Sequence, residues 1–133
     1  MNFTDKGQSL VELAISFVFL MFLLAGAVEF GLAFFQFVQL RDAAQEGALY
    51  GSYCPDQSQI EMRARSASNS PIDLHGINVD VAISNDGFEG GALQVTMLYQ
   101  HEVFMPFIDK FTGDFITLRA TVVDTILSVD GCA

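Results

Sequence analysis

The hydrophobic residues of this chain gather in one stretch near its N-terminus. Residues 10–40 are almost all apolar, and the part 13–28 carries no charged side chain. A helix over residues 10–40 would be about 45 Å long, which is enough to cross a bilayer and emerge from it. The pattern predicts one long helix over residues 8–50, whose residues 10–36 form a transmembrane segment.

After residue 40 the helical pattern becomes amphipathic, which indicates that the end of the long helix packs on a folded domain. Leu40, Ala44 and Ala48 share one helical face. The opposite face is polar and carries Arg41, Asp42, Gln45 and Glu46. Residues 51–133 are predicted to form the small domain that covers the apolar face.

This domain is predicted to contain a short helix followed by three strands. Residues 56–59 (Asp-Gln-Ser-Gln) read as a capping box, and apolar residues follow them at helical spacing. Apolar and polar residues then alternate over 77–84 and 93–99, and a third strand is expected over about 115–127. The predicted fold class is α+β: a long N-terminal hydrophobic helix packed on a small antiparallel β-sheet domain with a short second helix.

Two segments of the domain have alternative readings. Residues 105–111 are strongly apolar, and we expect them to bury Phe107 and Phe111 rather than to form an exposed contact with a neighbouring subunit. The loop 85–89 contains carboxylates but lacks the alternating oxygen ligands of an EF-hand. It is read as a solvated hairpin turn, and no metal site is predicted.

The charge of the chain argues against nucleic-acid binding. The formal net charge is −10, with 16 acidic residues against six Lys and Arg. Phosphate recognition needs clustered basic side chains, and here the only two that lie close in sequence are Arg63 and Arg65. Adsorption to an anionic bilayer surface is disfavoured for the same reason.

The two cysteines, Cys54 and Cys132, bracket almost the whole polar half of the chain. Lys6 weakly favours a cytoplasmic N-terminus, which would place both cysteines outside the cytoplasm. A disulfide between them would close a long loop and stabilise the domain by about 4 to 5 kcal/mol in the chain-entropy model. Two buried free thiols are the alternative. A zinc site fits poorly, because no cysteine or histidine partner stands nearby.

Catalytic chemistry finds little support in the sequence. No metalloprotease, serine-hydrolase or phosphate-loop motif occurs. His75 and His101 have no recognisable partner and are read as surface or strand-edge residues. We therefore expect no enzyme, no catalytic residue and no cofactor.

Glu12 is the most informative residue of the apolar stretch. A carboxylate buried there without a partner costs several kcal/mol, so it needs a counter-charge or a path to the lipid headgroups. If the chain is cut after Gly7, the new amine of Gln8 lies about one helical turn away. The same amine on a neighbouring subunit is equally available, and such pairing would set the axial register of packed helices.

A secretory signal peptide fits this N-terminus poorly, because the apolar stretch is long and no cleavage site with a polar break follows it. The run 6–12, Lys-Gly-Gln-Ser-Leu-Val-Glu, instead resembles the type IV prepilin processing site. In that family a membrane peptidase cuts after glycine, and glutamate stands fifth in the mature chain. The resemblance implies a leader over residues 1–7, cleavage between Gly7 and Gln8 by a prepilin peptidase, and a pilin-like fold.

Further motifs are similar to the TadE-like pseudopilins of the tight-adherence pilus systems. They are the run 11–14, the stretch 26–31, the Ala-Ala-Gln-Glu-Gly-Ala motif at 43–48 and the C-terminal run 95–121. The resemblance implies a pilin or minor pseudopilin that polymerises with other copies and other pilus subunits. Such a subunit resides in the inner membrane before assembly and afterwards in a filament at the cell surface.

The alternative is a single-pass envelope protein that never polymerises and serves a pilus or secretion machine as an accessory component. The helix lacks the central proline of many type IV pilins, although Gly26 and Gly31 could loosen it. Ala27 and Gly31 stand four residues apart and would let another helix approach closely. Glu29 is read as reaching water or Gln36 and the headgroups, with an inter-subunit contact as the other possibility.

Overall fold

The computed structural model describes residues 3–67, 74, 77–84, 87–104 and 109–132. The predictions for His75, for Phe107 and for the start of the loop 85–89 lie outside these residues, as does the side chain of Phe111. The elements, in chain order, are α1 (Phe3–Gly51), α2 (Gln57–Ser66), β1 (Asn78–Ile83), β2 (Ala92–Glu102), α3 (Asp109–Thr112) and β3 (Phe115–Thr125).

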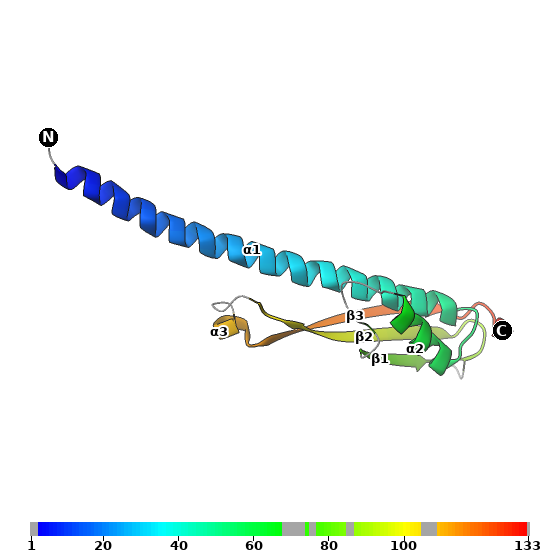
Figure 1. Cartoon of the computed structure of the whole chain (residues 1–133). Helices are drawn as coiled ribbons and strands as arrows, with labels where there is room; N and C mark the ends of the chain where they lie inside the picture. Colours follow the sequence, from blue (N-terminus) through cyan, green and yellow to red (C-terminus); the bar gives the residue numbers. More distant parts are fainter. Residues whose placement is uncertain (1–2, 68–73, 75–76, 85–86, 105–108, 133) are drawn as a thin grey trace.

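The three strands form one antiparallel sheet in the order β1-β2-β3, as the alternating pattern predicted (Figure 1). Val95 in the central strand stands opposite Val81 of β1 and Val122 of β3. Leu93, Val95 and Met97 are fully buried because they point from β2 towards the helices, as alternation along a strand requires. The α+β prediction is confirmed.

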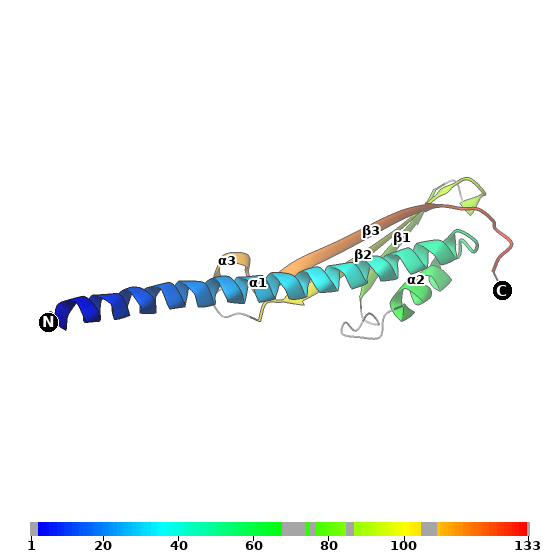
Figure 2. The ribbon, with the colours of Figure 1, turned by 90° about the horizontal axis from the view of Figure 1, so that it is seen from above.

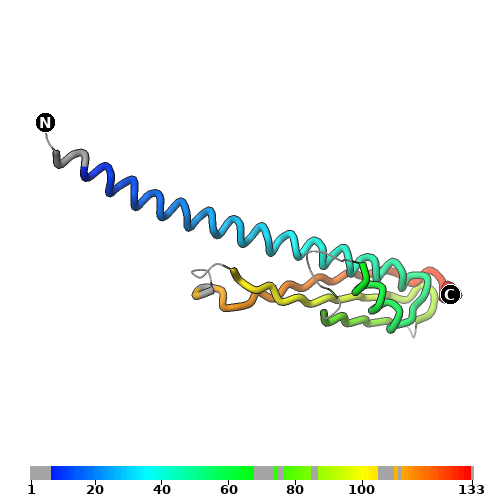
Figure 3. Tube along the Cα trace, in the orientation of Figure 1, coloured from blue at the N-terminus to red at the C-terminus, as the bar shows by residue number. Residues whose placement is uncertain are grey.

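Helix α1 is continuous through Gly26 and Gly31 and is far longer than the sheet. Its C-terminal half lies along the sheet, while its N-terminal half stands clear of every other element (Figures 1 and 3). Seen from above, α2 lies on one side of α1 and β3 on the other (Figure 2). The molecule thus consists of a small domain on one end of a long helix.

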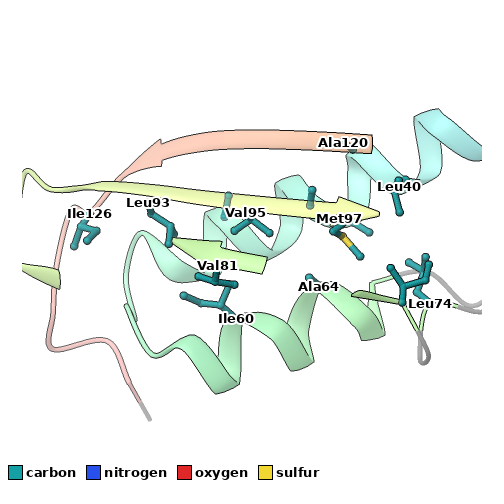
Figure 4. Close-up of a cluster of buried hydrophobic side chains, with 14 residues drawn as sticks. Leu40, Ile60, Ala64, Leu74, Val81, Leu93, Val95, Met97, Ala120 and Ile126 are labelled. Carbon is teal, nitrogen blue, oxygen red and sulfur yellow. The ribbon is translucent and has the colours of Figure 1, made fainter. Parts of the chain in front are cut away.

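The core lies where α1, α2 and the sheet meet (Figure 4). The predicted apolar face of α1 is buried, whereas Arg41, Asp42 and Gln45 on the other face are exposed. Burial of side chains from α1, α2 and the sheet supplies the main stabilisation of the domain. The buried apolar residues of this core include Leu40, Ala44 and Ala48 of α1, Ile60 and Ala64 of α2, and Val81, Leu93, Val95, Met97 and Ala120 of the sheet.

The small residues near the end of α1 allow α2 to approach closely. Ala43, Ala44 and Ala48 are buried, and a Cβ added at Gly47 would lie 2.9 Å from the Cβ of Ala64. That atom sits directly on the backbone of α2 and cannot move aside without shifting the helix. The Ala-Ala-Gln-Glu-Gly-Ala motif is therefore a helix-packing surface inside the domain.

The capping box is half formed. Asp56 is the N-cap of α2, and its carboxylate accepts a hydrogen bond from the backbone N–H of Gln59 at 3.0 Å. The side chain of Gln59 does not return the bond but accepts one from the hydroxyl of Tyr50 at 2.6 Å. The same glutamine thereby ties α2 to α1.

Cys54 and Cys132 form a disulfide, with their Cα atoms 4.8 Å apart. Backbone hydrogen bonds support the same junction: the N–H groups of Leu127 and Ser128 donate to the carbonyl of Ser52, and that of Gly131 donates to Tyr53. The last residues of the chain are thus held against the end of α1, which closes the domain.

We expect Gly47→Ala to destabilise the domain by up to about 2 kcal/mol, because overpacking against Ala64 outweighs the gain in helix propensity. Gly31→Ala is the matched control, since an added Cβ there meets nothing within 4 Å. Thermal unfolding of the full chain in detergent, followed by circular dichroism, measures both. Equal shifts for the two variants would contradict the packing role of Gly47.

The Ser58 hydroxyl and then the Gln59 N–H hold the pKa of the Asp56 carboxyl below the ordinary aspartate value of 3.8. A lowered pKa in the folded state gives stability that is present above pH 3.8 and is lost as the pH falls through the folded value. We expect Asp56→Ala to destabilise α2 and to reduce the loss of stability at low pH. Asp56→Asn should retain the cap without this pH dependence. Hydrogen exchange of the α2 amides as a function of pH measures the stability of the helix, and an unchanged loss at low pH in Asp56→Asn would rule out this carboxyl as its source.

Candidate assembly surface of the first helix

The N-terminal half of α1 packs against no other part of the chain that the structure describes. All residues from 7 to 24 are exposed, and among the described residues α1 is the one helix long and apolar enough to cross a membrane. Leu10 is 67% exposed and Phe19 is 64% exposed, as large apolar residues of a folded domain seldom are. This surface must therefore be covered by lipid or by other protein.

The length of the uncovered segment agrees with the thickness of a bilayer. Residues 8–28 span about 31 Å, and the hydrocarbon core is about 30 Å thick. The sheet begins to cover α1 at Gly26 and Glu29, which line a groove together with Ile116 and Leu118 of β3. The boundary between uncovered and covered helix thus lies close to Glu29.

A buried polar network stands at that boundary. His101 near the end of β2 is 1% exposed, and Glu29 is 3% exposed. The Nε2 of His101 lies 2.9 Å from Oε1 of Glu29, and its Nδ1 lies 2.5 Å from Oε1 of Gln36. The backbone N–H of Phe104 also donates to Oε1 of Glu29, at 3.1 Å. Glu29 and Gln36 of α1, together with His101 of β2 and the N–H of Phe104 just after it, therefore hold the end of β2 against α1.

Both ring nitrogens of His101 have an oxygen partner, Glu29 at one end and Gln36 at the other, so the ring is held from both sides. A buried carboxyl with partners of this kind costs less than an isolated one at the edge of an apolar segment.

The sequence interpretation of these residues was wrong in two respects. His101 is neither a surface residue nor an edge residue, because it points inward from the central strand. Glu29 does not reach water, since it is buried against His101 and the N–H of Phe104. A signal was available: His101 continues the inward alternation of Leu93, Val95 and Met97 along β2.

The groove beside this network is almost wholly apolar. It has a volume of about 450 Å³ and runs between α1 and β3. Glu29 also lines it, and its buried Oε2 has no hydrogen-bond partner among the described residues. Its lining residues are Gly26, Glu29, Phe30, Ala33, Phe34, Phe37, Ile116 and Leu118.

The other predicted site residues are distributed along α1. Gln8 and Glu12 are exposed, and Gly7 lies inside the helix, so cleavage after it requires the first turns to unwind. Ala27 and Gly31 are exposed, and at about 100° per residue they lie on the side of α1 next to Phe34, at the edge of the groove. They remain free to meet a second helix. Among the described residues, no three His, Cys, Asp or Glu side chains group as a metal site.

The long apolar helix capped by a small antiparallel sheet is a pilin-like arrangement. Residues 7–49 match the model of the TadE-like protein family, which confirms the family resemblance over this segment. The match covers α1 alone, so the likeness of the C-terminal run lies outside the matched residues. No curated protein and no solved structure matches the chain.

Replacing one member of the buried pair should cost far more than replacing both. Glu29→Leu leaves the buried His101 without its acceptor, and His101→Leu leaves a buried carboxyl without its partner. Each variant should therefore lose about 3–5 kcal/mol in its free energy of unfolding. In the double variant we expect much of this loss to be recovered, because apolar side chains then fill the site. The free energies of unfolding of the parent, the two single variants and the double variant, each measured on the full chain in detergent, test this expectation.

Glu102→Leu is the control for the double variant, since Glu102 is the exposed neighbour of His101 on β2. It should leave stability within about 0.5 kcal/mol of the parent. Additive losses in the double variant would show that the two side chains do not act as a pair.

Proposed function

We propose that this chain is a structural subunit, a pilin or minor pseudopilin, of an extracellular type IV pilus-like filament. It polymerises through the N-terminal half of α1 and performs no catalysis. The observation that carries this proposal is the exposed apolar surface of residues 7–24, which continues the helix on which the domain is built. The match to the TadE-like family over the same helix supports it.

Two environments can cover this surface in turn. Before assembly, residues 8–28 cross the inner membrane and the domain lies at the outer face, with Glu29 and His101 near the headgroups. During assembly the same segment exchanges lipid for the helices of other copies. Packing between apolar helices does not gain from the hydrophobic effect within a membrane, so close contact and polar pairing must drive it.

Glu12 supplies such a polar contact. A prepilin peptidase cuts after Gly7, and the amine of Gln8 then lies about one turn from the Glu12 carboxylate of its own chain or near that of a neighbour. Pairing in the bundle removes the cost of an isolated carboxylate in apolar surroundings. The pairing also selects one axial register, which a permanent membrane anchor does not require.

The test compares Glu12→Gln with the parent in cells that contain the pilus assembly machinery. We expect unchanged amounts in the membrane and at least about tenfold less of the chain in sheared surface filaments, equivalent to about 1.4 kcal/mol of lost assembly energy. Glu89→Gln is the control, because Glu89 is an exposed carboxylate in the hairpin of the domain.

Mass spectrometry of the mature chain from the same cells should give Gln8 as the first residue. Normal filaments from Glu12→Gln would refute the register role of this side chain. A chain that retains Met1 and stays in the membrane fraction would instead identify a single-pass accessory component.

A further inference from the structure

The sheet points one of its ends towards the N-terminus of α1. Leu93, at the start of β2, lies close to Gly51 at the end of α1. His101, near the end of β2, bonds instead to Gln36 and Glu29. Strand β2 therefore runs back along α1, and α3, which follows it, stands at the end of the sheet nearest to the N-terminus of the helix in both views (Figures 1 and 2).

Two contacts set the depth of this end of the sheet. The backbone N–H of Phe104 donates to Oε1 of Glu29 at 3.1 Å. Ile116 of β3 lines the groove in which Gly26 also lies. Residues 8–28 span about 31 Å, which is about the thickness of the hydrocarbon core. When this segment crosses a membrane, the connection from β2 to β3 is therefore held at the outer boundary of the hydrocarbon.

The exposed side chains at this connection are of the kind that enter a lipid interface. Phe104 is 75% exposed and Phe115 is 53% exposed. Lys110 of α3 is also exposed, and a lysine can lay its apolar stem in lipid while its amine reaches the phosphates. Large apolar side chains at this depth gain free energy by leaving water for the bilayer interface. We call Phe104, Lys110 and Phe115 together the hairpin tip.

We propose that the hairpin tip inserts into the outer surface of the membrane that α1 crosses. This inference rests on the membrane stage of the proposed function and adds a second point at which the domain contacts lipid. A domain attached by one helix can rotate about the axis of that helix, whereas a second contact to one side restricts the rotation. Transfer of the chain into a filament then withdraws the hairpin tip from lipid together with residues 8–28.

The attraction is apolar rather than electrostatic. Glu102 and Asp114 are exposed at the same end of the sheet and oppose binding to anionic headgroups. Insertion therefore needs no anionic lipid, and vesicles of zwitterionic phosphatidylcholine are the matching probe. High salt, which screens exposed charges, should leave the insertion unchanged.

Tryptophan fluorescence tests the insertion, because the chain contains no tryptophan of its own. Phe104→Trp keeps an aromatic side chain at the hairpin tip. Phe88→Trp is the matched control, because Phe88 is 67% exposed but lies in the connection from β1 to β2, at the opposite end of the sheet. Phe19→Trp reports on α1 itself, where Phe19 is 64% exposed. Each full-length variant is placed in phosphatidylcholine vesicles at a low ratio of protein to lipid, with or without bromine on the acyl chains.

We expect brominated lipid to quench Phe104→Trp several-fold more strongly than Phe88→Trp, in low and in high salt. The emission of Phe104→Trp should also lie at shorter wavelength, since its indole leaves water. Phe115→Trp, on the neighbouring strand, should behave as Phe104→Trp does. Agreement between these two variants excludes an effect of one substitution on its own surroundings.

The outcomes separate this inference from the proposed function. Quenching in Phe19→Trp without quenching in Phe104→Trp and Phe115→Trp would overturn the inference and leave α1 in the membrane. Emission at shorter wavelength without quenching would mean that protein covers the hairpin tip, and it would overturn the inference as well. If Phe19→Trp is not quenched, α1 does not enter the bilayer, and the membrane stage of the proposed function fails together with this inference.

Discussion

The structure depends on one constraint: a single helix must satisfy two different surroundings along its length. The C-terminal half of α1 is the spine of a small domain, where Leu40, Ala44 and Ala48 are buried by α2 and the sheet. The N-terminal half presents apolar side chains on every side, and no other element of the described chain covers them. The domain therefore stabilises only part of the helix, and the rest needs a membrane or other copies.

The Glu29–His101 pair lies at the boundary between the part of α1 that the domain covers and the part that it leaves uncovered. It lies at the first turn of α1 that the sheet reaches, where Glu29 finds its hydrogen-bond partners within the chain. A lone carboxylate at this depth would resist both the membrane and a filament core. The contact with His101 keeps the domain attached to α1 at this boundary, so the proposed transfer of residues 8–28 from membrane to filament does not expose an unpaired Glu29.

Much of the fold could be predicted because it follows from local patterns. Helical spacing predicted α1 and α2, and alternation predicted the first two strands. The amphipathic pattern after residue 40 predicted the face of α1 that packs on the domain. The Glu29–His101 contact was missed because its partners are 72 residues apart and each looked solitary. The groove was also missed, since it exists only where α1 and β3 lie side by side.

The central claim is that the uncovered half of α1 becomes the core of a filament. Helical reconstruction by electron cryomicroscopy of filaments purified from cells producing this chain tests it most directly. The account predicts density for residues 8–28 at the centre, packed against the same segment of other copies, with the sheets outside. Filaments that lack this chain, or that hold its sheet at the centre and its helix at the surface, would contradict it.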